Sequence, residues 1–162
     1  AKPRPKRLAS IETPAALTYC RRGLPMNITP DIFKHIPEMK GFHQPLADIF
    51  GMACVRGEAL GKVFNAKDKV YYTTLWDPMQ WVLGPSNDSS VSFQTVSGRK
   101  QLTPADFMKA MDEIRPGIAC LLSDHIKPSS SGRTRKSVKR TIEWTRECIK
   151  ISKKIWPEKS GE

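Results

Sequence analysis

Several short segments carry side chains that favour β-strands. Residues 70–76 (VYYTTLW) are almost all β-branched or aromatic, which predicts a strand. Residues 91–96 alternate large apolar and polar side chains, residues 97–98 (Ser-Gly) favour a turn, and residues 100–102 follow as a short partner. This pattern predicts a β-hairpin. Residues 16–20 predict a further strand near the start of the chain.

Two segments begin with Thr-Pro and then place an acidic residue in the first helical turn, a pattern typical of a helix start. Residues 29–31 therefore predict a short helix, which Pro37 ends. Residues 103–106 predict a longer helix, in which Asp106 can reach back to the cap and which Pro116 ends. The apolar faces expected of these two helices are Ile32, Phe33 and Ile36 in the first, and Phe107, Met108, Met111 and Ile114 in the second.

The last third of the chain predicts a buried strand followed by a long helix. Residues 118–122 (IACLL) are apolar throughout, as in a strand buried on both faces. Residues 134–155 contain no Pro or Gly and predict a helix. Helix, strand, loop and helix in this order predict an α/β fold with a parallel sheet and helices outside it. The apolar stripe expected of the long helix is Val138, Thr141, Ile142, Thr145, Cys148, Ile149, Ile151 and Ile155.

The length of 162 residues is enough for one ordinary domain and too short for two. Residues 1–14 hold three prolines and four basic residues and predict a flexible basic arm, followed by the domain at 15–156 and a short tail at 157–162. Within the domain, residues 38–69 show weak periodicity and predict little beyond a short helix near residues 45–52. The longest runs without a charged residue are ten residues, against the ~20 that a membrane helix needs, and no secretory signal is visible.

Charge is concentrated in two parts of the chain. The net charge is +11; residues 1–7 contribute +4, and residues 127–154 contribute +8 from ten basic residues and two acids. Residues 8–126 hold twelve charges of each sign and are neutral. This clustering favours a polyanionic partner, RNA, DNA or acidic lipid, and the alternative is a solvated helix face. The candidate phosphate contacts are Arg133, Arg135, Lys136, Lys139 and Arg140.

Candidate chemistry is sparse. The cysteines at 20, 54, 120 and 148 include no CxxC pair and lie in apolar surroundings, so we expect reduced, buried thiols and no metal ligands. Asp124 follows the predicted strand at 118–122, at the edge where functional groups gather in parallel sheets. It could accept hydrogen bonds from a flat heterocycle or cap the loop. Because Asp124 and His125 are adjacent, we expect their side chains to diverge, and no catalytic triad is indicated.

Several of these segments, taken in order, resemble the tRNA-guanine transglycosylase family. They are VSFQTVSGR at 91–99, LTPAD at 102–106, the strand that ends at Asp124, and KSVKRTIEW at 136–144. The LSD at 122–124 and the KSV at the start of the last segment are similar to the non-catalytic branch of the family. The resemblance covers about residues 17–155.

The resemblance implies a fold and a function. The fold would be the N-terminal portion of a (β/α)8, or TIM, barrel with antiparallel hairpin insertions, incomplete in this chain. The chain would be part of a non-catalytic subunit that pairs, as a heterodimer, with a catalytic queuine tRNA-ribosyltransferase subunit. That enzyme exchanges guanine for queuine at the wobble position of tRNA, in queuosine modification. The resemblance also implies a cytoplasmic protein that can associate peripherally with mitochondria.

The family's residues carry over only in part. Asp124 matches a base-binding Asp, but His125 and the loop at 127–132 replace the second acid and the aromatic loop of the catalytic branch, so we expect a vestigial base pocket. The family's nucleophilic Asp and its zinc site would lie beyond residue 162, so we expect no catalytic residue, cofactor or metal in this chain. Two alternatives stay open: a divergent catalytic transglycosylase that uses Asp124 to bind the base, and a stand-alone basic RNA-binding module.

Overall fold

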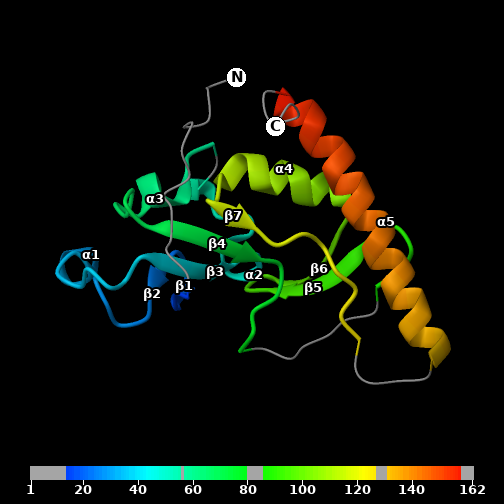
Figure 1. Cartoon of the computed structure of the whole chain (residues 1–162), viewed down its shortest axis with the longest axis horizontal. Helices are drawn as coiled ribbons and strands as arrows, with labels where there is room; N and C mark the ends of the chain where they lie inside the picture. The colour runs from blue at the N-terminus through cyan, green and yellow to red at the C-terminus, as the bar shows by residue number, and fades with distance from the viewer. Residues whose placement is uncertain (1–13, 56, 80–85, 127–130, 158–162) are drawn as a thin grey trace.

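Four parallel strands form the sheet that organises the chain (Figure 1). They are β1 (Leu17–Arg21), β3 (Gly41–Pro45), β4 (Val70–Thr74) and β7 (Ile118–Ala119), and each pairs with the next. The two-residue strand β2 (Leu24–Pro25) pairs antiparallel with β1. The parallel strands follow one another across the sheet in chain order. This arrangement confirms the predicted α/β class with a parallel sheet.

The computed structural model describes residues 14–55, 57–79, 86–126 and 131–157. The predicted arm at 1–14 and tail at 157–162 lie almost wholly outside these ranges, and so does the loop at 127–130. The helices within the described residues are α1 (Pro30–Phe33), α2 (Leu46–Ile49), the 3-10 turn η1 (Ala53–Val55), α3 (Leu60–Val63), α4 (Pro104–Ile114) and α5 (Ser131–Ile155).

The predicted helix start at 103–106 is confirmed. Thr103 Oγ1 accepts a hydrogen bond from the Asp106 amide at 3.2 Å, and Asp106 Oδ2 accepts one from the Thr103 amide at 3.3 Å. These reciprocal bonds satisfy amides that lack a partner at a helix N-terminus. The earlier start at 29–31 also forms a helix, but α1 is a single turn, with Phe33 fully buried and Ile32 half exposed, so the apolar face expected there is wrong at Ile32.

The predicted hairpin is confirmed as β5 (Val91–Thr95) and β6 (Gly98–Leu102), a separate two-stranded sheet. Gly98 lies at the turn with a φ of 105°, a conformation that favours glycine. The ring of Phe93 packs edge-to-face on Phe50, with centroids 5.3 Å apart. The hairpin therefore packs beside α2, close to the parallel sheet.

A central strand, β3, forms where weak periodicity predicted no strand. The segment reads GFHQP, without a run of β-branched residues, so the sequence pattern gives little indication of it. Tertiary contacts fix it: Gln44 is fully buried, and its Oε1 accepts a hydrogen bond from the Gly23 amide at 2.7 Å. Pairing with β1 and β4 on both sides satisfies the backbone of β3. The short helix predicted near 45–52 is confirmed as α2.

The strand predicted at 118–122 is shorter and more exposed than expected. Only Ile118 and Ala119 pair with β4, at Tyr72 and Thr73. The side chain of Ile118 is 47% exposed and Cys120 is exposed, so burial on both faces is wrong. The reason is position: within the described residues, β7 is the last strand of the sheet and has a neighbour on one side only.

The long helix is confirmed, but it begins at Ser131 and buries a different face from the one predicted. The fully or nearly buried residues are Ser137, Trp144 and Cys148. Three members of the expected apolar stripe are exposed instead: Val138 (53%), Ile142 (45%) and Ile149 (45%). The helix turns Trp144 inward because this large ring packs in the core and its indole Nε1 donates to the Asp88 carbonyl at 3.0 Å.

Candidate functional site

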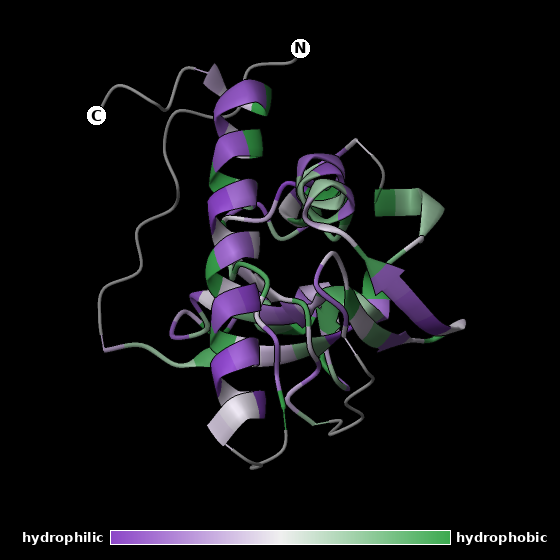
Figure 2. Cartoon of the chain, turned by 90° about the vertical axis from the view of Figure 1, so that its right-hand side faces the viewer, coloured by the Kyte–Doolittle hydropathy of each residue, from purple (hydrophilic) through white to green (hydrophobic). Residues whose placement is uncertain are grey.

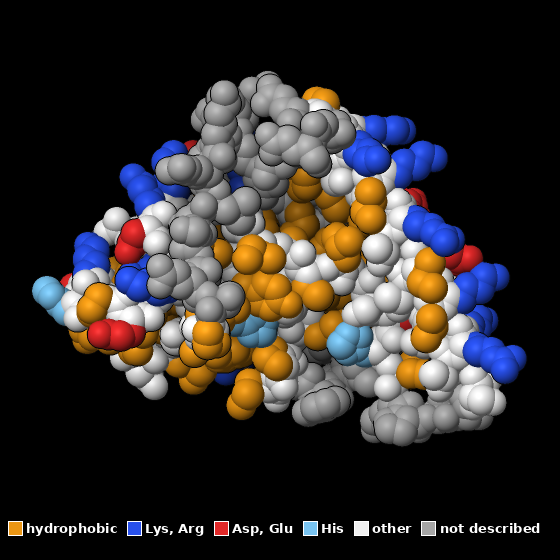
Figure 3. Space-filling model, viewed as in Figure 1, with side chains coloured by type: hydrophobic (Ala, Val, Ile, Leu, Met, Phe, Trp, Pro, Cys, Tyr) orange, Lys and Arg blue, Asp and Glu red, His pale blue; other side chains and the backbone are white. Residues whose placement is uncertain are grey.

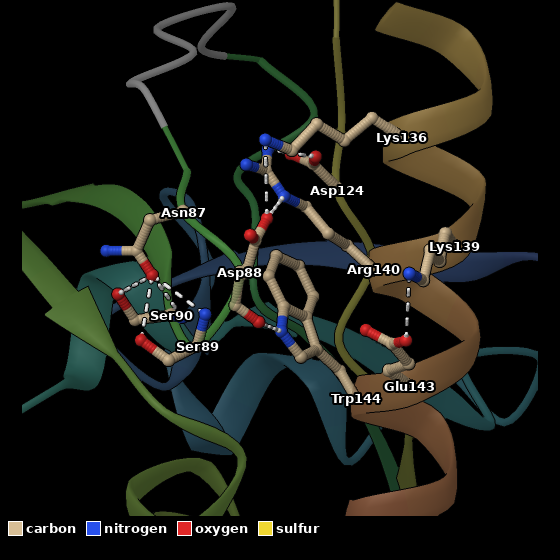
Figure 4. Close-up of polar contacts among 10 residues, drawn as sticks. All are labelled: Asn87, Asp88, Ser89, Ser90, Asp124, Lys136, Lys139, Arg140, Glu143 and Trp144. Carbon is tan, nitrogen blue, oxygen red and sulfur yellow. Dashed lines mark hydrogen bonds and ion pairs between the residues drawn. The ribbon is translucent and has the colours of Figure 1, made fainter.

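Asp124 lies in the segment between β7 and α5, held against α5 (Figure 4). Its backbone amide donates to Thr141 Oγ1 at 3.0 Å, and its carbonyl accepts from Ser137 Oγ at 2.6 Å. Its side chain is only 3% exposed. These contacts fix Asp124 to the helix rather than leaving it at the end of a free loop.

The carboxylate of Asp124 is bound by an arginine of the same chain. Arg140 Nη1 lies 3.2 Å from Asp124 Oδ2, and Arg140 Nε donates to Asp88 Oδ1 at 2.8 Å. Burial favours the neutral form of Arg140, but its hydrogen bonds to Asp88 and Asp124 prevail and raise its pKa. Hydrogen bonding to Arg140, with the nearby charge of Lys136, lowers the pKa of Asp88. Arg140 therefore joins the segment before β5 to the segment that follows β7.

The five candidate phosphate contacts divide into two groups. Arg140 is 15% exposed and is engaged with two carboxylates, so it is the least available for an external anion. The other four, Arg133, Arg135, Lys136 and Lys139, are exposed on α5. Lys136 Nζ lies 3.6 Å from Asp88 and Lys139 Nζ lies 3.9 Å from Glu143, and exposed pairs of this kind are weak. We call these four residues the basic face.

The basic face lies on the outside of the molecule. In Figure 2, α5 runs vertically and faces the viewer, and its ribbon is mainly hydrophilic, with hydrophobic positions along its flanks. Figure 3 shows Lys and Arg side chains along the outer edge of α5. The cluster of basic residues expected from the sequence therefore lies on the surface of the molecule.

A cavity of about 310 Å³ opens at the carboxyl ends of β3, β4 and β7. Its lining includes His43, Trp76, Asp77 and His125. The rings of Trp76 and His125 stack with centroids 5.7 Å apart and an angle of 37°. Asp124 is not among the lining residues. As predicted, the side chains of Asp124 and His125 diverge, one toward α5 and the other toward the cavity.

Two polar groups at this end of the sheet were not found by sequence reasoning: His43 lies within β3, and Asp48 lies in α2, directly after that strand. His43 Nε2 lies 2.8 Å from Thr74 Oγ1, and burial lowers the pKa of His43 despite the opposing charge of Asp77. Nearby, Asp48 is 7% exposed and its Oδ2 makes no hydrogen bond within the described part of the chain. Burial, and then the charge of Asp77, raise the pKa of Asp48. The cavity itself is lined by the rings of His43, Trp76 and His125 and by one carboxylate, that of Asp77.

The cysteines are all free, as predicted, but only two are buried. Cys20 and Cys148 lie in the core, whereas Cys54 and Cys120 are exposed, so the expectation of four buried thiols is wrong. Among the described residues, no three His, Cys, Asp or Glu side chains gather as a metal site would require. The same residues include no helix with the length and apolar character to cross a membrane.

Comparison of the sequence with known proteins identifies its family. The family model for queuine tRNA-ribosyltransferase matches residues 5–161. A queuine tRNA-ribosyltransferase accessory subunit 2 from Trichoplax adhaerens is 34% identical over 94% of this chain and 43% of the relative. Proteins of the same name from Xenopus tropicalis and Homo sapiens are 26% and 24% identical, each over 88% of this chain and 36% of the relative.

The chain thus spans less than half the length of these relatives. The parallel strands in chain order, the capped helix after the hairpin, and the contact between Asp124 and Arg140 all lie within the matched residues. Since that match extends over nearly the whole sequence, the chain belongs to the queuine tRNA-ribosyltransferase, or tRNA-guanine transglycosylase, family.

Proposed function

We propose that the chain is part of a non-catalytic subunit of a heteromeric queuine tRNA-ribosyltransferase. Its role would be to support the exchange of guanine for queuine at the wobble position of tRNA. The observation that carries this proposal is the likeness, over 86–94% of the chain, to proteins named as accessory subunit 2. The partners are then a catalytic queuine tRNA-ribosyltransferase subunit and tRNA, and the compartment is the cytoplasm.

For the fold, we propose that the four parallel strands are the first part of a (β/α)8 barrel. Support comes from their chain order and from the helices that separate them: α1 before β3, α2 and α3 before β4, and α4 before β7. The hairpin β5–β6 is then an antiparallel insertion between β4 and α4. Parallel strands that pair in chain order through helical connections generate a barrel when strand addition continues.

We propose that Asp124 is a vestige of a base pocket. Its carboxylate is bound by Arg140, and its side chain is outside the cavity that His43 and His125 line. An incoming heterocycle would have to displace a charge-assisted hydrogen bond to reach it. The chain alone should therefore lack base-exchange activity.

The experiment supplies labelled guanine or queuine and substrate tRNA to three samples: this chain, the catalytic subunit, and both together. The proposal expects the chain to co-elute with the catalytic subunit and incorporation only where that subunit is present. Failure to co-elute would contradict the partnership. Incorporation by the chain alone that Asp124→Asn abolishes, and that Asp31→Asn on α1 leaves intact, would instead support a divergent catalytic transglycosylase.

We further propose that the basic face contacts tRNA phosphate. The four side chains are exposed and lie on the first turns of a helix, where N-terminal amides also attract anions. Replacing Arg133, Arg135, Lys136 and Lys139 with Gln should weaken binding similarly for all tRNAs, because phosphate contacts carry no sequence information. Each lost contact should flatten the log–log salt dependence by about 0.7 for single-stranded and about 0.9 for duplex targets.

The matched control replaces Lys34, Lys67, Lys100 and Lys109, four exposed lysines elsewhere, with Gln, which gives the same net charge change. Arg140 stays unchanged because its loss would break the contacts to Asp88 and Asp124. Both variants are titrated with salt in the complex with the catalytic subunit. Equal slopes of the log–log salt dependence for the two variants would show that the basic face is a solvated helix surface that does not contact tRNA. Binding by the isolated chain at the strength of the complex would favour a stand-alone RNA-binding module.

Finally, we propose that this chain holds no zinc of its own, the family's zinc site lying beyond residue 162. The four cysteines and three histidines are scattered along the sequence, whereas a structural zinc site needs four convergent ligands. Elemental analysis of the purified chain should find far less than one zinc per chain. Stoichiometric zinc that survives mild chelation would contradict this proposal.

A further inference from the structure

The hairpin β5–β6 lies outside the parallel sheet and has a free edge. Strand β6 pairs with β5, and among the described residues it has no second strand neighbour. Arg99, Lys100 and Gln101, the middle of β6, are all exposed. A Cβ atom added at Gly98 would meet nothing within 4 Å, so the space around the start of β6 is open. Strand β6 is therefore an edge strand that another chain can approach.

The backbone of β6 offers hydrogen-bonding groups along this edge. Thr95 and Gly98 flank a two-residue turn, and residues in this position form a hydrogen-bonded pair. Bonded and non-bonded pairs alternate along an antiparallel ladder, so Lys100 also bonds to β5, opposite Phe93. The amides and carbonyls of Arg99 and Gln101 then face away from β5. A row of unpaired groups of this kind can pair with another extended segment.

An apolar cavity lies at the end of this edge. It has a volume of about 250 Å³, is lined by residues of α2, β6 and α4, and includes Gln101 and Leu102 of β6 in its lining. Its other apolar lining residues include Leu46, Ile49, Phe50, Ala110 and Ile114. The charged lining residues, Asp106, Lys109 and Glu113, carry both signs. The cavity therefore suits an apolar side chain better than an ion of one sign.

The exposed side chains of β6 decide the charge of a matching partner. Arg99 and Lys100 form no ion pair within the described part of the chain. Because adjacent residues of a strand point to opposite faces, each face of β6 presents one positive charge. A second copy of the chain that paired with β6 edge to edge would bring like charges together, which opposes self-association. An acidic segment would instead be attracted on both faces.

We infer that the β6 edge binds an extended acidic peptide of a partner protein, which adds a strand to the hairpin. The peptide backbone pairs with Arg99 and Gln101, its carboxylates face Arg99 and Lys100, and an apolar side chain beyond Leu102 enters the cavity. In strand addition, main-chain hydrogen bonds give affinity and side-chain pockets give specificity. The free edge presents donors and acceptors in turn, which matches a peptide backbone, whereas the phosphate groups of RNA offer acceptors only.

The test selects ligands for the 162-residue chain from a phage-displayed library of short random peptides. The same selection uses the β6 variant, Arg99→Glu/Lys100→Glu, and a control, Lys153→Glu/Lys154→Glu, at exposed residues of α5 with the same change in net charge. The selected peptides are synthesised, and fluorescence anisotropy measures their dissociation constants. Amide hydrogen exchange of the wild-type chain, with and without peptide, measures protection along β6 and does not depend on how well a variant folds.

The inference expects the wild type and the control to select acidic peptides with an apolar residue at one end, and the β6 variant to select basic ones. An acidic peptide should bind the β6 variant at least about tenfold more weakly, because attractive charge pairs become repulsive. Bound peptide should slow exchange at the amides of Arg99 and Gln101 but not at Lys100. Charge attraction without strand pairing would not give this alternation.

Selection of peptides without an acidic bias, or equal affinity of an acidic peptide for the β6 variant and the control, would overturn the inference. Unchanged or uniform protection of the β6 amides would overturn it as well. Binding of single-stranded polyuridylate that the β6 variant loses, with no acidic peptide selected, would replace it with an RNA surface. A dimer of the chain that the β6 variant dissociates would replace it with self-association.

Discussion

Arg140 binds Asp124 across the junction of α5 and β7, with Nη1 3.2 Å from Oδ2 and the Asp124 side chain 3% exposed. The same guanidinium reaches Asp88, whose side chain is 73% exposed. The two carboxylates thus differ widely in burial although one arginine serves both. Removal of Arg140 leaves a charge with little solvent at Asp124 and a well-solvated charge at Asp88.

Arg140→Gln should therefore lower the free energy of unfolding by about 2 kcal/mol, below the value for fully buried pairs because part of the guanidinium is exposed. Asp88→Asn should change it far less than Arg140→Gln does, since an exposed ion pair contributes little. The measurement is urea denaturation at neutral pH. In the double variant Arg140→Gln/Asp124→Asn, the loss should be smaller than the sum of the single losses. Strict additivity would show that the contact between Arg140 Nη1 and Asp124 Oδ2 contributes no coupling energy.

Trp144→Phe should destabilise the chain by about 1 kcal/mol through the hydrogen bond lost between the indole Nε1 and the Asp88 carbonyl. Trp76→Phe is the matched control, because Trp76 Nε1 is buried and makes no hydrogen bond within the described residues. Trp76→Phe should lower the free energy of unfolding by less than Trp144→Phe does. Thermal or urea unfolding of both variants measures the difference. An equal loss in both would show that ring volume, not the hydrogen bond, decides the effect.

The four thiols should react in two classes. Burial raises the pKa of Cys148 to about 11 and that of Cys20 to about 12, whereas Cys54 and Cys120 are exposed. At pH 8 only about 0.1% of Cys148 would be thiolate, the reactive form. A disulfide reagent should therefore titrate two thiols in the native chain and four in denaturant. In Cys54→Ser/Cys120→Ser, rapid labelling should disappear, and labelling that persists would contradict the burial of Cys20 or Cys148.

Asp48→Asn should stabilise the chain at neutral pH by about 1 kcal/mol, because the native carboxylate is buried and its Oδ2 has no hydrogen-bond partner in the described structure. Burial and the charge of Asp77 raise the pKa of Asp48 in the folded state above its unfolded value. The ionised form thus opposes folding above the raised pKa, and this cost vanishes as pH falls below the unfolded pKa near 4.

Denaturation of the wild type and Asp48→Asn across pH 4–8 measures this effect. The advantage of the variant should shrink as the pH falls. A constant advantage would assign the effect to packing rather than to ionisation. Asp31→Asn on α1 is the control, since Asp31 is exposed and its pKa is lowered by a hydrogen bond from Thr29.

Elements with strong local character could be predicted from the sequence. The Thr-Pro-x-Asp box at 103–106 fixes a helix start through contacts within four residues, and the alternation at 91–96 fixes a hairpin through adjacent strands. The β-branched and aromatic run at 70–76 gives β4 for the same reason. The α/β class followed from the order of these elements, whereas the strand expected to end next to Asp124 ends at Ala119.

Other features depend on contacts between residues far apart in the sequence, and only the tertiary structure decided them. Strand β3 exists because β1 and β4 pair with both of its sides, although its own residues favour no strand. The side of α5 that is buried was set by the packing of Trp144 and its bond to Asp88, 56 residues away, against the preference of the apolar stripe. The partners of Asp124, and the cavity that His43 and His125 share, arise likewise from side chains that the sheet brings together. Local pattern determines which elements form; the fit of large side chains and the satisfaction of buried polar groups determine how they face one another.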